Sequence, residues 1–274
     1  MKTNQPDAMD HPGERRLRSD RGKPQLTLRD LDILRIIGEQ TAYRFDQLQG
    51  LLARHPETQS ADPDVLSETR TTAIIRRWQH LGLADYRKIL HDQPSWIWLT
   101  AKGLSHLGLA LRFHEPAYAD LEHLYWINET RTLVEDTYGS QPGFQWESER
   151  QFRAIREQLK AQQKREPYLW LPLEYQGTHR PDAVVRYRLS AEPEAYEVVS
   201  AIEVELSEKS ATTWEKIFFD LTHYYSMTHY YVDLSIKKSF HRTLVHFQSE
   251  ETSVGSASSQ KRQSIYVHDL EERL

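Results

Sequence analysis

The sequence contains no cysteine, so disulfide bonds and thiolate metal sites are excluded. It also lacks any apolar run near the ~18 residues that a membrane span needs, and its polar amino terminus lacks the apolar middle of a secretory signal. Neither a glycine-rich phosphate loop nor a serine-centred nucleophile elbow is present. We therefore expect a cytoplasmic protein that uses neither a membrane nor a nucleotide cofactor.

The charge is divided unevenly along the chain. The formal net charge of the 274 residues is −5. Residues 1–112 carry 17 Lys and Arg against 14 Asp and Glu, whereas residues 113–274 carry 18 against 26. Because a phosphate backbone attracts local basic patches rather than a favourable average, this division permits nucleic-acid binding by the first half. The length itself favours two domains.

The pattern in the first half is that of a winged helix-turn-helix. Residues 1–24 have no apolar period and predict a disordered tail. Thr27 and Asp30 have capping-box spacing and open the first predicted helix, and Ser67 is a suitable N-cap for the third. The predicted elements of residues 25–112 are helices at 27–38, 46–52, 67–81 and 101–111 and strands at 83–90 and 96–99.

The third of these helices carries the DNA-binding prediction. Ile74, Ile75, Trp78 and Leu81 lie at helical spacing and are expected to pack on the first helix. The opposite side and its borders then present side chains that donate to phosphates and read base edges in the major groove. These candidate DNA-binding residues are Thr69, Arg70, Thr72, Arg76, Arg77 and Gln79, joined by Arg87 and Lys88 from the wing.

The second half predicts an α/β domain with a mixed sheet. A proline-containing linker at residues 113–120 precedes residues 121–274. We expect helices at 121–138, 152–165, 212–227 and 240–250, and strands near 144–150, 182–189, 195–206, 230–236 and 264–268. Strand alternation places Glu203 and Glu205 on one face of the third strand. If that strand pairs with the one beginning at Asp182, then Asp182 and Glu203 could share a divalent cation.

The carboxylates give the chain a resemblance to a known fold. Pro181-Asp182 followed by Glu203-Val204-Glu205 resembles the motif of the PD-(D/E)xK, or restriction-endonuclease-like, fold. That resemblance implies metal binding by Asp182 and Glu203, with Mg²⁺ or Mn²⁺ if the domain is catalytic. Glu205 stands where the catalytic lysine is usual, and Lys209 and Lys216 are the candidates for supplying the missing cation. A glutamate at that position fits both active nucleases and folds that have lost catalysis. Further candidate metal ligands are Glu135 on the first helix of this half, or Glu147 and Glu149 on its first strand.

The two-domain chain over residues 26–235 also resembles the replication-relaxation family of plasmids and mobile elements. The matching fragments are residues 26–34, 76–83, 98–103, 146–147, 180–183 and 202–205, with His123 and Asn128. The family implies double-stranded DNA binding in plasmid replication, relaxation or mobilisation, or in transcriptional regulation, with replication or mobilisation proteins as partners. A homodimer reading two half-sites is the expected assembly.

Three functional hypotheses follow from these patterns. The first is a sequence-directed DNA-binding protein whose nuclease-like domain is non-catalytic. The second is a metal-dependent DNA endonuclease that uses Asp182, Glu203 and Glu205. The third is a protein-interaction module, in which the basic helix contacts protein rather than DNA.

Overall fold

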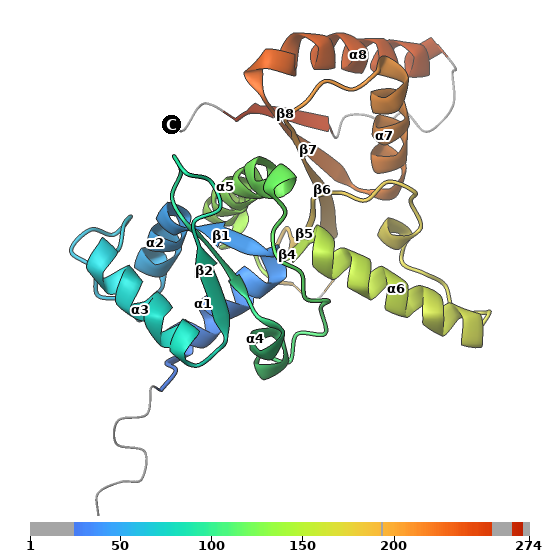
Figure 1. Ribbon diagram of the computed structural model, residues 1–274. Coiled ribbons are helices and arrows are strands. Elements are labelled where there is room, and N and C mark those ends of the chain that lie inside the picture. The colour runs from blue at the N-terminus through green and yellow to red at the C-terminus, as the bar shows by residue number, and fades with distance from the viewer. Residues whose placement is uncertain (1–24, 193, 254–264, 271–274) are drawn as a thin grey trace, which may run out of the picture.

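The computed structural model describes residues 25–192, 194–253 and 265–270. The predicted tail at 1–24 therefore lies outside the described residues. The protein is α+β, with a three-stranded antiparallel sheet followed by a five-stranded mixed sheet (Figure 1). Within the described residues, no helix combines the length and the apolar character that crossing a membrane requires.

The small sheet lies in the first half and is backed by helices. Its strand order is β1-β3-β2. One face covers a core of aliphatic side chains from α1, α2 and α3, with Trp78 fully buried among them. The elements are α1 Leu28–Gln40, β1 Ala42–Arg44, α2 Phe45–Arg54, α3 Glu68–His80, β2 Ala84–Arg87, β3 Trp96–Leu99 and α4 Ala101–His106.

The large sheet has the order β4-β5-β6-β7-β8, antiparallel from β4 to β6 and parallel from β6 to β8. Side chains of α5 pack on one face, and those of α6, α7 and α8 pack on the other. The elements are α5 Leu121–Tyr138, β4 Gln145–Ser148, α6 Glu149–Arg165, β5 Ala183–Arg188, β6 Glu197–Glu205, α7 Ala211–Tyr224, β7 Met227–Val232, α8 Leu234–Ser253 and β8 Ile265–Asp269, with short 3₁₀ turns at Tyr118–Asp120 and Leu173–Tyr175.

Helix α5 connects the two sheets, because it contributes to both cores. Leu121 packs with Trp96 and Trp98 on the outer face of the small sheet, and Val134 packs against the large sheet. Buried polar contacts support this junction: the Asn128 side-chain amide donates to the Ala42 carbonyl at 2.9 Å. The DNA-binding half predicted from the sequence is thus in direct contact with the second half.

Most predicted elements form where the sequence places them, and the differences have local causes. The capping box of Thr27 is present. The helix predicted to reach Leu111 ends at His106, because Gly108 adopts a left-handed conformation (φ 66°) that stops it. Strand β1 was not predicted, since three residues are too few for a visible alternation. Strand β7 spans Met227–Val232 rather than the predicted 230–236, because it pairs with β6 from Ser200 onward. Helix α8 begins at Leu234, six residues before its predicted start.

Candidate nucleic-acid interface and buried carboxylate cluster

The outer side of α3 is a polar surface open to solvent. Ile74, Ile75 and Trp78 are buried as the helical spacing predicts. Of the predicted DNA-binding residues on this helix, Thr72 and Arg77 are half-buried, and the exposed ones are Thr69, Arg70, Arg76 and Gln79. Figure 1 shows α3 at the edge of the molecule, away from the five-stranded sheet. The protein's own second half therefore does not cover this surface.

Arg77 differs from the adjacent Arg76 because its side chain is bonded to a carboxylate of the protein. Its guanidinium Nη2 lies 2.6 Å from Oδ2 of Asp30 on α1, a carboxylate with no exposed surface. The indole Nε1 of Trp78 also donates to this carboxylate, at 3.2 Å. Arg77 therefore anchors α3 to α1. Among the described residues, Arg76 has neither an ion pair nor a hydrogen bond to another side chain.

The remaining basic residues of this region have mixed surroundings. The Arg70 side chain donates to the Gln59 carbonyl, which lies in the loop before α3. Arg87, at the end of β2, pairs with Glu115 and places its guanidinium 4.8 Å from the ring centroid of Trp98. Lys88 follows in the turn after β2 and is exposed. Arg87 and Lys88 thus lie on the surface of the predicted wing.

The second candidate site lies where β5 and β6 pair. The two strands pair, as the carboxylate hypothesis requires, and they are antiparallel, with Ala183 opposite Ile202. Asp182 comes directly before β5, and its Oδ2 accepts the Val204 amide of β6 at 2.8 Å. The Asp182 side chain thereby continues the hydrogen bonding of the sheet past the first residue of the strand.

Asp182 also has an imidazole partner from a distant element. His123 on α5 places Nε2 at 3.3 Å from Asp182 Oδ2 and 3.2 Å from the Val204 carbonyl. Burial opposes the protonation of His123, but the Asp182 charge and these hydrogen bonds outweigh it and raise its pKa to about 9. The pair is therefore an imidazolium bound to a carboxylate at neutral pH.

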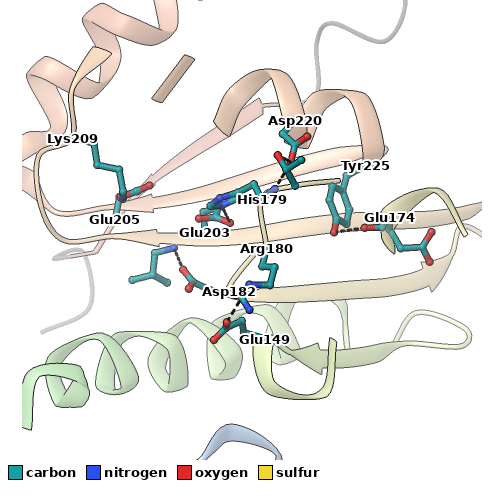
Figure 2. A network of polar contacts seen from close by, with 12 residues as sticks. Glu149, Glu174, His179, Arg180, Asp182, Glu203, Glu205, Lys209, Asp220 and Tyr225 are labelled. Atoms are coloured by element: carbon teal, nitrogen blue, oxygen red, sulfur yellow. Dashed lines mark hydrogen bonds and ion pairs between the residues drawn. The ribbon is translucent and has the colours of Figure 1, made fainter. Parts of the chain in front are cut away.

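Glu203 is buried and bonded to a second imidazole. Its Oε1 lies 2.9 Å from Nε2 of His179, in the segment before β5 (Figure 2). Burial, together with the nearby Asp182 charge, raises the pKa of Glu203 to about 7, although His179 opposes the shift. The carboxylate in turn raises the pKa of His179 against its burial. Because each group shifts the pKa of the other, His179 and Glu203 titrate as a coupled pair.

Glu205 is the most enclosed of the three carboxylates, with 1% of its side chain exposed. Its Oε2 is bonded to the ammonium of Lys209, four residues later, and burial raises its pKa while Lys209 opposes the shift. The other oxygen, Oε1, has no hydrogen-bond partner among the described residues. Lys209 therefore reaches the cluster as the sequence hypothesis expects, but it contacts Glu205.

The side chains of this cluster are bonded to basic partners within the protein. No group of three or more His, Asp or Glu side chains in the described part of the chain is placed to hold a metal ion. Asp182, Glu203 and Glu205 each have a basic partner instead. The other candidate ligands are also occupied: Glu135 pairs with Arg131, Glu147 with Arg186, and Glu149 with Arg153.

The two imidazoles are the part of this cluster that sequence reasoning did not assign. His179 lies three residues before Asp182, so its proximity was a local signal that could have been used. His123 is 59 residues from Asp182, and no local pattern connects them. Each histidine gives one carboxylate a basic partner: His123 bonds to Asp182, and His179 bonds to Glu203.

Comparison with known proteins adds no relative: no family model, no curated protein and no solved structure matches the chain.

Proposed function

We propose that the protein binds double-stranded DNA through the outer side of α3, as a winged helix-turn-helix. The observation that carries the proposal is the solvent exposure of Thr69, Arg76 and Gln79 on a helix whose apolar side is buried. A helix with Arg, Thr and Gln side chains on one face offers donors for phosphates and for base edges in the major groove. The exposed Arg87 and Lys88 supply the wing contacts.

In the proposed binding mode, the adjacent residues Arg76 and Arg77 have different roles. Arg76 faces solvent and contacts the DNA, whereas Arg77 neutralises Asp30 and holds α3 at its angle to α1. Gln79 is one turn beyond Arg76 and reads base edges, and Thr69 contacts the backbone at the start of the helix. The affinity then falls as salt rises, because each contacted phosphate releases counterions.

We further propose that the second half is a PD-(D/E)xK-like scaffold that does not cut DNA, in a protein serving replication, relaxation, mobilisation or transcription of a mobile element. The basic partners of Asp182, Glu203 and Glu205 support this proposal, because they balance the charges that a metal would otherwise neutralise. A homodimer would let two α3 helices read two half-sites.

The endonuclease alternative is favoured by one observation, the partnerless buried Oε1 of Glu205. Supercoiled plasmid is incubated with the protein and Mg²⁺ or Mn²⁺, beside Asp182→Ala and Glu203→Ala. We expect the plasmid to stay intact in every arm. Cutting by the parent protein that both substitutions abolish would replace the non-catalytic proposal with the nuclease.

The DNA-binding proposal is tested by fluorescence anisotropy of a labelled duplex over a series of salt concentrations. We expect salt-sensitive binding that Arg76→Ala and Gln79→Ala weaken. Lys238→Ala, which removes an exposed cation on α8, is the control and leaves the affinity unchanged. Absence of salt-sensitive duplex binding would favour the protein-interaction module instead.

A further inference from the structure

The end of α6 and the segment that returns from it form a projecting arm with two bare aromatic rings. We call residues 156–172 the α6 arm. Tyr168 is 95% exposed and Trp170 is 88% exposed, more than any other large apolar side chain among the described residues. Figure 1 shows α6 extending away from both sheets. Both rings offer a large flat apolar surface that a partner can cover.

The arm is held in place by hydrogen bonds rather than being a loose loop. The Gln163 side chain donates to the Leu169 carbonyl at 3.0 Å, and that of Gln176 donates to the Leu171 carbonyl at 2.7 Å. The Arg156 guanidinium donates to the carbonyl of Gly177. The base of the arm is anchored by Phe152, which is fully buried and belongs to the core. The aromatic rings are thus presented by an ordered scaffold.

The arm is basic although the half of the chain that contains it is acidic. Residues 156–172 carry four Lys and Arg against two Glu. Lys160, Lys164 and Arg165 are exposed near the end of α6, on the same arm as the two rings. A hollow of about 270 Å³ lies beside Trp170 and is lined by Lys160, Gln163, Trp170, Leu171, Tyr175 and Gln176. One cation, Lys160, therefore lines the same recess as an exposed indole and two side-chain amides.

We propose that the α6 arm binds a single-stranded nucleic acid, whose bases stack on Tyr168 and Trp170 while its phosphates lie along the basic end of α6. Every base has a flat face that an aromatic ring can stack on, so this recognition does not require a particular sequence. The charge complementarity selects this partner over an apolar peptide, because covering Lys160, Lys164 and Arg165 with an apolar surface would leave three cations without compensation.

The arm is separate from the surface proposed for duplex binding. In Figure 1, α3 and the free end of α6 lie on different sides of the molecule. The base of α6 is beside the carboxylate cluster, because the Glu149 amide donates to the Asp182 carbonyl at 2.8 Å. A duplex on α3 and an unpaired strand on the arm can therefore be bound by one molecule, and the two proposals can fail independently.

The test is the anisotropy of a fluorescein-labelled 15-nucleotide oligothymidylate with the full-length protein. We expect Trp170→Ala and Tyr168→Ala each to weaken binding about tenfold, as the loss of one stacked base predicts, and Trp170→Phe to restore most of it. Tyr118→Ala, at a residue that is 71% exposed outside the arm, is the matched control and leaves the affinity unchanged.

The duplex experiment separates this proposal from the preceding one. Arm variants are expected to keep the parental duplex affinity, and Arg76→Ala to keep the parental affinity for the single strand. Equal single-strand binding by the parent and both arm variants would overturn the proposal, as would no measurable single-strand binding at all. A fall in molar mass of Trp170→Ala in analytical ultracentrifugation would also overturn it, by assigning the arm to contact with a second copy.

Discussion

The outer side of α3 and the carboxylate cluster beside β6 both concentrate charged residues, but they direct that charge differently. On α3, Arg76 faces solvent and its neighbour Arg77 is bonded inward. In the cluster, Glu203 and Glu205 are buried and bonded to His179 and Lys209. A charge that the fold has left in water is available to a partner. A buried charge that is bonded to its own counterion is already compensated within the fold, and removing its partner leaves it uncompensated.

The largest effect is expected from removing Asp30, the buried α1 carboxylate to which Arg77 and Trp78 of α3 are bonded. Asp30→Ala leaves the Arg77 guanidinium and the Trp78 indole without their acceptor and also removes the Thr27 capping contact. We expect the free energy of unfolding to fall by about 3–5 kcal/mol, measured by urea denaturation. Asp32→Ala, with a side chain that is 62% exposed, is the control and changes stability by less than about 0.5 kcal/mol.

The corresponding substitution in the carboxylate cluster is Lys209→Met. It leaves Glu205 buried without its cation, so we expect a loss of about 2–3 kcal/mol at pH 8. The loss shrinks as the pH falls, because Glu205, whose pKa burial already raises, becomes neutral. The double variant Lys209→Met with Glu205→Gln recovers most of the stability. Denaturation curves showing no recovery would contradict a structural role for this pair.

Arg76 and Arg77 of α3 are expected to differ in their effects on DNA binding and on stability. Arg76→Ala is expected to weaken duplex binding by about 1–3 kcal/mol, because it removes one DNA contact, and to leave stability within about 0.5 kcal/mol. Arg77→Ala is expected to reduce both, since Arg77 holds Asp30. Anisotropy and thermal melting of the two variants side by side give the comparison. Equal effects of the two substitutions on stability would show that Arg77 does not anchor α3 to α1.

The smallest expected effect is the pH dependence contributed by His123. Its pKa of about 9 in the folded protein lies above the ordinary 6.5. Its contribution is therefore complete below pH 6.5 and is lost as the pH rises toward 9. The side chain is 40% exposed, so screening reduces the loss to roughly 1 kcal/mol. His123→Gln should flatten this part of the stability profile, and an unchanged slope would show that the pair is not formed.

The helical period of residues 68–80 was enough to predict which side of α3 is buried, because Ile74, Ile75 and Trp78 repeat at helical spacing. It could not distinguish Arg76 from Arg77. These residues are adjacent, and the carboxylate that separates their roles is Asp30, 47 residues before Arg77. A local pattern contains no information about such a contact.

In the carboxylate cluster, too, the local pattern predicted the position of the acids but not their partners from distant parts of the chain. Strand alternation predicted that Glu203 and Glu205 share a face, and the strand beginning beside Asp182 does pair with theirs. The partners of these acids decide their chemistry. One partner, His123, reaches Asp182 from α5, which packs on the face of the large sheet opposite to α6, α7 and α8. Charge balance in a buried site is set by tertiary contacts, so a row of acids in a sequence does not distinguish a metal site from a set of ion pairs.

Photo-crosslinking tests the central claim most directly. A benzoylphenylalanine is placed at Gln79 on α3 and, in a separate protein, at Lys238 on α8, both exposed positions. Each protein is irradiated with a labelled duplex at low salt. We predict a crosslinked product from position 79 that competitor duplex removes, and none from position 238. Crosslinking from position 238 with none from position 79 would contradict the assignment of α3 as the DNA-binding helix.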